Sequence, residues 1–196
     1  MGKGKDMEKD KVAVKVVVIG GSAGSLEALL SFLPRIPSVP YAIVIVVHRK
    51  GGDDRMLEDL IASKCILIVD DFEDKTILVP NKIFVAPSDY HLLFEKNGQL
   101  SVDLSPKVNY SRPSIDVTFE SASEAYGEAV VGLLLSGANA DGTQGLIDIK
   151  NAGGTTAIQD PKDSSIDYMP EHARVHANPD FILKVAEIPD WLLSLK

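Results

Sequence analysis

Three polar residues of the chain have the types that nucleophilic catalysis uses, and each follows an apolar run. Ser22 lies in a Gly-Gly-Ser-Ala-Gly turn after the run 14–19, and His48 directly follows the run 42–47. Asp141 comes shortly after a third run, Ala129 to Leu135. A serine hydroxyl needs a histidine to take its proton, and the imidazole needs a carboxylate to fix its tautomer and orientation. These residues therefore predict acyl transfer with Ser22 as nucleophile, His48 as base and Asp141 as orienting carboxylate.

Each of these residues also has a plainer interpretation. Glycine-rich turns between strand and helix can cradle a phosphate or simply pack a helix tightly on a sheet. A dinucleotide site would have glycine at Ser22 and an acid near the end of the second strand, where this chain has His48. His48 alone could be a strand-end histidine in a polar loop. Asp141 alone reads better as the N-cap of the helix that follows it.

Backbone amides in two small-residue loops could stabilise a developing oxyanion. Ala23 follows the serine, and Ala138 lies in Ser-Gly-Ala-Asn-Ala-Asp-Gly, so their N–H groups are the donors we would test. His91 is expected within a strand. His172 and His176 are spaced i, i+4, but without a His-Glu-x-x-His arrangement they predict surface histidines rather than a zinc site.

Composition sets the limits of the chain. At 196 residues it is long enough for one domain with a real core, with 45% hydrophobic and 24% charged residues as in soluble globular proteins. Its apolar runs are too short to span a bilayer. The net charge of −8 disfavours nonspecific binding to nucleic acid or anionic membranes. The single cysteine, Cys65, cannot form an internal disulfide and is expected to be buried in a strand.

Apolar runs alternate with helical patterns along most of the chain, which is typical of parallel βαβ units. Residues 1–11 are charged, lack the apolar core of a signal peptide and predict a disordered tail before a domain over 12–196. The Asn97-Gly98 pair between two alternating runs predicts a hairpin. The expected strands are 14–19, 42–47, 66–69, 83–86, 90–94, 100–104, 129–135 and 155–158. The expected helices are 25–33, 54–63, one opening at 113–114, 143–151, 170–176 and 189–195.

This order predicts an α/β fold with a doubly wound, mostly parallel sheet, helices on both faces and an antiparallel hairpin near one edge. In such sheets the ligand crevice lies at the carboxyl ends of the strands. Ser22, His48 and Asp141 all follow predicted strands. The fold is thus expected to bring the three candidate residues to one edge.

Several motifs together resemble one known family, the catalytic domain of CheB-type protein-glutamate methylesterases. The similarity extends from about Val14 to the C-terminus. The motifs that carry it are Gly20-Gly21-Ser22-Ala23-Gly24, Val47-His48, Ala86-Pro87-Ser88-Asp89-Tyr90-His91, Ser111-Arg112-Pro113-Ser114-Ile115-Asp116-Val117, Ser136-Gly137-Ala138-Asn139-Ala140-Asp141-Gly142, Gln159-Asp160 and Met169-Pro170.

Because residues 1–11 lack the apolar core of a signal peptide, the protein is expected to stay in the cytoplasm. The resemblance implies an enzyme that needs no cofactor. It would hydrolyse glutamate γ-methyl esters on methyl-accepting chemotaxis receptors, release methanol and also deamidate certain receptor glutamines. Ser22, His48 and Asp141 match the family's nucleophile, base and orienting carboxylate, and Ala138 matches the position of an oxyanion amide. Arg112, in the Arg-Pro-Ser motif near the substrate groove, would bind substrate or form a structural ion pair.

The chain also departs from the family pattern. Ala23 replaces a common threonine, Arg49-Lys50-Gly51 replaces a Met-Pro-Pro segment, and Ala138 replaces a methionine. These changes put receptor specificity in doubt more than the chemistry. Residues 1–11 are too short for the N-terminal receiver domain typical of the family. The chain is expected to be unregulated, regulated by a separate chain, or a fragment of a longer protein.

Three other functions stay open on the sequence. A noncatalytic signalling module could keep this fold and bind receptor-like helices. An esterase or amidase of the same mechanism could act on a non-receptor substrate. A nucleotide-binding domain of the Rossmann type would bind a dinucleotide, which calorimetry would detect.

Overall fold

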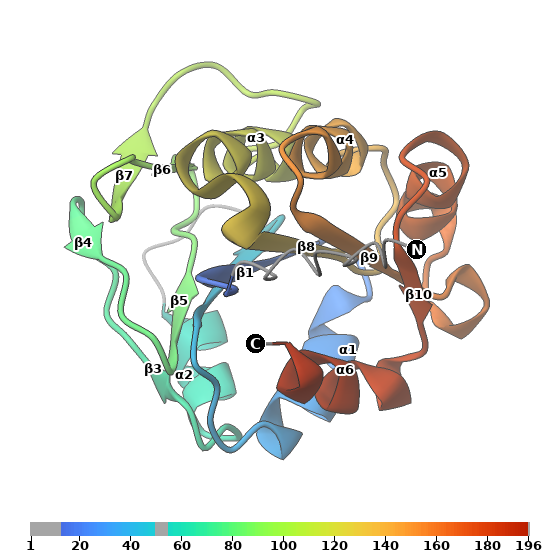
Figure 1. Ribbon diagram of the computed structural model, residues 1–196, viewed down its shortest axis with the longest axis horizontal. Helices are drawn as coiled ribbons and strands as arrows, with labels where there is room; N and C mark the ends of the chain where they lie inside the picture. Colours follow the sequence, from blue (N-terminus) through green and yellow to red (C-terminus); the bar gives the residue numbers. More distant parts are fainter. Residues whose placement is uncertain (1–12, 50–54, 196) are drawn as a thin grey trace, which may run out of the picture.

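Figure 1 shows the computed structural model of the protein, which describes residues 13–49 and 55–195. A parallel sheet of seven strands runs through its centre, in the order β10-β9-β8-β1-β2-β5-β3. Its two central strands, β1 and β2, consist of buried residues only, because helices cover both faces of the sheet. The strands are β1 (Val16–Gly21), β2 (Ala42–Val47), β3 (Ile68–Val69), β5 (Lys82–Val85), β8 (Val130–Leu134), β9 (Thr155–Gln159) and β10 (Phe181–Leu183).

Two layers of helices enclose the sheet. In Figure 1, α3, α4 and α5 lie above it, and α1, α2 and α6 lie below. Alternate residues of β1 serve the two faces, since Val17 and Ile19 join the core with α1 and α6 while Val16 and Val18 join the core with α3 and α4. The helices are α1 (Ser25–Phe32), α2 (Met56–Ala62), α3 (Ile115–Tyr126), α4 (Thr143–Asn151), α5 (Tyr168–His176) and α6 (Ile188–Ser194).

The expected hairpin is present, but it does not join the main sheet. Strands β6 (His91–Phe94) and β7 (Gln99–Asp103) pair antiparallel, and β4 (Thr76–Ile77) pairs with β7 to complete a separate three-stranded sheet. Gly98 has φ 85°, the left-handed conformation that the Asn-Gly turn requires. Leu92, Phe94 and Leu100 pack this sheet into the core beneath α3.

The predicted fold class is confirmed, and most elements shift by one or two residues. The largest change at the first strand is that Gly20 and Gly21 belong to β1, so the turn itself is short. Cys65 was expected in a strand, but it lies half-buried in the loop before β3. Strands β4 and β10 were not predicted, because each is very short and largely exposed. The predicted tail 1–11 lies outside the described residues.

Strand register brings the first two candidate residues together. Gly21 of β1 pairs with Val47 of β2, so the next residues of both strands, Ser22 and His48, lie side by side at the carboxyl edge. On the other side of β1, the Ser22 N–H donates to Ser136 O at 2.9 Å. None of the described helices has the length and apolar character needed to cross a bilayer.

Candidate active site

The backbone of Ser22 is fixed by the start of α1. Both the N–H and the hydroxyl of Ser25 donate to Ser22 O, at 3.0 Å and 2.7 Å. Gly24 has φ 83°, a left-handed conformation that glycine adopts without strain, and it lets the chain turn from β1 into the helix. The Ser22 side chain is half-buried at this turn, close to the N-terminal amides of α1, which favour negative charge.

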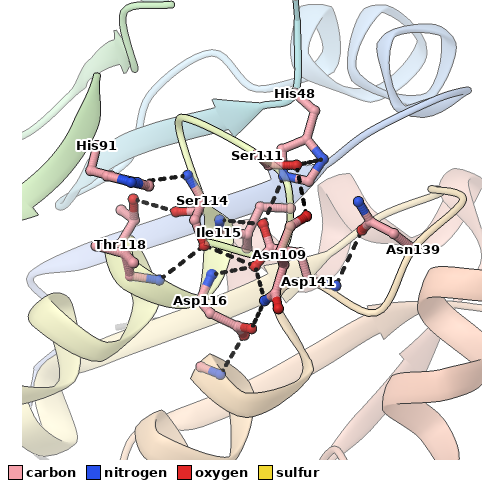
Figure 2. A network of polar contacts seen from close by, with 12 residues as sticks. His48, His91, Asn109, Ser111, Ser114, Ile115, Asp116, Thr118, Asn139 and Asp141 are labelled. Atoms are coloured by element: carbon pink, nitrogen blue, oxygen red, sulfur yellow. Dashed lines mark hydrogen bonds and ion pairs between the residues drawn. The ribbon is translucent and has the colours of Figure 1, made fainter. Parts of the chain in front are cut away.

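His48 links β2 to the rest of the site. Its backbone N–H donates to Gly21 O at 3.1 Å, and its ring Nε2 lies 2.7 Å from Asp141 Oδ2. The other ring nitrogen, Nδ1, lies 3.3 Å from the hydroxyl of Ser111 (Figure 2). Because Nε2–H donates to the carboxylate, Nδ1 is the nitrogen that can accept a proton.

Asp141 is fully buried and accepts hydrogen bonds on both oxygens. Besides His48, Oδ2 accepts from the backbone N–H of Ile115 at 2.7 Å. Oδ1 accepts from Asp116 N–H at 3.1 Å, Ser114 Oγ at 2.9 Å and Asn109 Nδ2 at 3.1 Å (Figure 2). A carboxylate held by so many donors is kept ionised and in one orientation.

The hydrogen bonds decide the charge of Asp141. Burial alone would raise its pKa, but the bonds from His48, from the two backbone amides and from Asn109 outweigh burial and lower the pKa to about 2. The buried carboxylate is therefore negative at neutral pH. It can stabilise a positive imidazolium on His48 during a reaction.

The capping interpretation of Asp141 was wrong for its own helix. The N-cap of α4 is Gly142, without a side-chain cap, and Asp141 instead binds the first-turn amides of α3. The reverse bond also exists, since Asp116 Oδ1 in the first turn of α3 accepts from Gly145 N–H in α4 at 2.8 Å. Asp141, just before α4, thus accepts hydrogen bonds from the first turn of α3, and Asp116 of α3 accepts one from the first turn of α4. These bonds hold the Asp141 carboxylate in the orientation that faces His48.

Ser22 and His48 are adjacent, yet they are not hydrogen-bonded. The Ser22 hydroxyl forms no hydrogen bond with any described residue, and His48 Nδ1 is next to Ser111 instead. Sequence reasoning missed Ser111. Catalytic hydrogen bonds often tighten only when substrate is bound, so the absence of a Ser22–His48 bond here is compatible with the predicted pair.

Ala23 and Ala138, whose amides were expected as oxyanion donors, lie in the two loops next to Ser22. Ala23 and Ala138 are exposed, and their backbone N–H groups donate to no other part of the described chain. By contrast, the N–H of Gly137 donates to Ile166 O at 3.2 Å. The loop of Ala138 passes close to the serine, because a Cβ added to Gly137 would lie 3.0 Å from Ser22 Cβ. Both amides thus form no hydrogen bond within the described chain and lie in loops beside Ser22.

Arg112 lies beside the site but forms none of the expected ion pairs within the described residues. Its Nη1 donates to Leu104 O and Ser105 O, both at 2.9 Å, and its buried Nε lacks a described partner. Arg112 lines a cavity of about 400 Å³ that opens next to His48. The other lining residues are Arg49, Asp89, Lys107, Tyr110 and Ser111.

The other histidines form no hydrogen bond with Ser22, His48 or Asp141 within the described chain. His91 is buried, with Nδ1 accepting from Ser114 N–H at 3.1 Å and Nε2–H donating to Pro106 O at 3.0 Å. His172, expected on the surface, is half-buried and lies 3.0 Å from Thr143 Oγ1, while the exposed His176 packs against its ring. Within the ranges that the structure describes, no group of three or more His, Cys, Asp or Glu side chains could hold a metal.

Asn109, Ser114 and Asp116 complete the network around Asp141, and they were not singled out as site residues. The proline-serine pair 113–114 before α3 did predict a helix start there, and Ser114 is indeed its N-cap. Asn109 carries no comparable signal, because its contacts depend on a loop that brings distant residues together. It adopts φ 50°, a left-handed conformation that asparagine tolerates better than most residues.

Comparison with known proteins agrees with this geometry. The family model described as CheB methylesterase matches residues 17–192. A Leptospira interrogans protein is 38% identical over 92% of this chain and 94% of its own length, and it bears a provisional name as a protein-glutamate methylesterase/protein-glutamine glutaminase. A Thermotoga maritima protein with that name, given without reservation, is 33% identical over 95% of this chain, which spans 56% of the longer relative.

A solved structure also has the same fold. The crystal structure of the Thermotoga maritima CheB methylesterase catalytic domain matches 94% of this chain and 100% of its own, with a TM-score of 0.89 and 32% sequence identity. The matched family region contains β1 from its second residue on, the turn at Ser22, His48 and Asp141. The chain belongs to the CheB methylesterase family.

Proposed function

We propose that this protein is a serine hydrolase that demethylates glutamate γ-methyl esters on methyl-accepting chemotaxis receptors and releases methanol. The observation that carries the proposal is the short contact of His48 Nε2 with the ionised, buried Asp141, next to Ser22, in a chain of this family. Deamidation of receptor glutamines is a second reaction of the same site, in line with the double names of the relatives.

In the proposed first step, Ser22 Oγ attacks the ester carbonyl carbon while His48 Nδ1 takes the hydroxyl proton. Asp141 stabilises the imidazolium through Nε2–H. The carbonyl oxygen becomes an oxyanion, for which the backbone amides of Ala23 and Ala138 are the proposed donors. Loss of one such donor typically slows turnover about 10²–10³-fold.

Collapse of this intermediate breaks the bond to the methoxy group. The imidazolium of His48 gives its proton to the departing oxygen, methanol leaves, and the glutamyl group stays on Ser22 as an ester. Water then attacks this acyl-enzyme with His48 again as base, which restores the serine and leaves a glutamate carboxylate. These reaction steps change no oxidation state, so they need no external electron donor or acceptor.

The location and partners of the protein follow from the same proposal. A receptor whose methylated segment lies in the cytoplasm requires an enzyme in the same compartment. The proposed enzyme would therefore be cytoplasmic and would reach membrane receptors from the cytoplasm. Arg112 and the cavity beside His48 would contact the receptor segment around the ester. A receiver domain or regulatory chain that covers this face is the form of control we propose.

Methanol release from methyl-esterified receptor preparations tests the proposal. The unmodified protein should release methanol, while S22A and H48Q should fall to background with unchanged far-UV circular dichroism. The matched controls are S63A and H176Q, which change exposed residues and should keep full activity. Receptor binding without release, even with S22A, would instead favour a noncatalytic module. Hydrolysis of small methyl esters without release from receptors would favour a different substrate.

A further inference from the structure

The amide of Asn109 bridges two carboxylates. One Nδ2 nitrogen donates to Asp116 Oδ2 at 2.8 Å and to Asp141 Oδ1 at 3.1 Å (Figure 2). An amide nitrogen carries two hydrogens, so one proton serves each carboxylate. The two acids must lie close to each other, because both are within hydrogen-bond distance of the same atom. Asn109 therefore offsets the repulsion between them.

Asp116 holds the second helix of the pair. Its Oδ1 accepts from Gly145 N–H, while its own backbone N–H donates to Asp141. The two helices approach very closely here, because a Cβ added to Gly145 would lie 2.4 Å from Phe119 Cβ. The starts of α3 and α4 are thus locked at a fixed separation, and Asp141 lies directly before α4.

We propose that Asn109 and Asp116 are positioning residues for ester hydrolysis, which keep the Asp141 carboxylate turned toward His48 and set the basicity of that histidine. The inference rests on the proposed function for its kinetic test, although the orientation of His48 can be tested without any substrate. Neither residue contacts the reacting atoms, and both act through Asp141.

The charges around Asp116 determine what its removal should do. Asp141 and, beyond it, His48 face Asp116 from the crevice, and Glu120 lies one turn farther along α3. The titratable groups on the elements packed against α3 are His91 on β6 and Asp148 and Lys150 on α4, with His172 of α5 beside α4. Strands β1, β2 and β8 carry no titratable side chain, and Glu128 is at the far end of α3. No described lysine or arginine pairs with Asp116, so its charge acts mainly on the Asp141–His48 pair.

The first test removes the bridging amide. Asn109→Gly keeps the left-handed backbone that this position adopts, so the main loss is the pair of hydrogen bonds. We expect kcat to fall about 10-fold at constant KM, well short of the roughly 10⁴-fold loss that follows disruption of a triad carboxylate. The matched control is N178G, which has φ 48° in a turn after α5 and should keep wild-type kinetics. Activity of N109G within twofold of N178G would overturn the role of Asn109.

The second test removes the charge of Asp116 with little change of shape. Asp116→Asn removes one negative charge from the surroundings of His48, which should make the imidazolium easier to deprotonate. The acid limb of kcat/KM should therefore shift measurably to lower pH. A residue that only maintained the fold would lower the rate at every pH and leave the limb in place. D190N, in the first turn of α6, serves as the control.

NMR of the imidazole Cε1–H signals gives the His48 pKa without substrate, with H48Q as the assignment control. An unshifted His48 pKa in D116N would overturn the role of Asp116, whatever its activity. A shifted pKa in a protein that releases no methanol would leave the positioning of His48 supported and would reject the proposed function instead. The two failures are therefore distinguishable.

Discussion

At the scale of single residues, the two acids at the α3–α4 junction have opposite environments. Asp141 receives hydrogen bonds from five groups, which keep its pKa well below the ordinary range despite full burial. Burial and the neighbouring Asp141 carboxylate raise the pKa of Asp116 to about 6. Asp141 is thus kept negatively charged next to His48, while Asp116 is the carboxyl group that takes up a proton more easily.

This difference predicts how stability depends on pH. The pKa of Asp116 is raised in the folded protein. Its contribution to folding stability is therefore fully present below the pKa of the unfolded chain and is lost as pH rises through about 6. The lowered pKa of Asp141 works in the opposite direction, with stability lost only as pH falls toward about 2. Between pH 4 and pH 7, Asp116 should therefore dominate. We expect D116N to gain roughly 2 kcal/mol relative to the unmodified protein over that interval.

Urea unfolding at pH 4, 5, 6 and 7 measures this gain. Hydrogen bonds that the substitution alters equally at all pH values cancel in the difference, so only the titration remains. D190N, which changes an exposed aspartate in the first turn of α6, is measured beside D116N as the matched control. A D116N curve parallel to that of the unmodified protein would show that the Asp116 carboxyl ionises as easily in the folded chain as in the unfolded one.

At the scale of elements, local patterns predicted what local patterns can determine. The apolar β-branched runs gave β1, β2 and β8, and residues 143–151 were predicted as a helix with the observed ends. The rule that parallel strands end at one edge placed Ser22 and His48 together correctly. It could not show that Asp141 caps α3, because that contact depends on how α3 and α4 pack. Asn109 was missed for the same reason.

The packing of α5 against the loop after β8 leads to a second prediction. In Gly137→Ala the new methyl group would lie 2.5 Å from Met169 Cε, at the end of a flexible side chain, and 3.0 Å from Ser22 Cβ. Met169 can move, so we expect a stability loss of only about 1 kcal/mol. Backbone hydrogen bonds leave Ser22 little room to relax, so even a small forced shift of its side chain should lower kcat about 10²-fold.

A double-mutant cycle separates these two effects. In a Met169→Ala background the added methyl group has room on one side, so G137A should no longer lower the free energy of unfolding. The loss of kcat should persist in the double variant, because the contact with Ser22 remains. Recovery of kcat together with stability would mean that Met169, and not the serine, transmits the effect of residue 137.

At the scale of the whole molecule, charge is distributed unevenly. The chain has a net charge of −8, yet the cavity beside His48 is lined by Arg49, Lys107 and Arg112, with Asp89 as the one acid among the described lining residues. Arg49 is neutralised by a two-pronged pair with Glu58, at 2.7 Å and 3.0 Å. Lys107 and Arg112 have no carboxylate partner among the described residues. These two cations make the cavity entrance positive on a protein that is acidic as a whole. A positive entrance favours a substrate segment that carries negative charge around the ester.

This distribution predicts a salt-dependent rate on polypeptide substrates. Replacement of the two unpaired cations in K107Q/R112M should lower kcat/KM on methylated receptor about 10-fold at low ionic strength, because attraction over a Debye length raises the rate of encounter. The difference from the unmodified protein should shrink several-fold at high salt, and a small uncharged methyl ester should be hydrolysed equally by both proteins. K64Q, an exposed lysine at the end of α2, provides the control for lost positive charge. An equal loss on the small ester would indicate that Arg112 shapes the catalytic site through its bonds to Leu104 O and Ser105 O rather than by attracting the substrate.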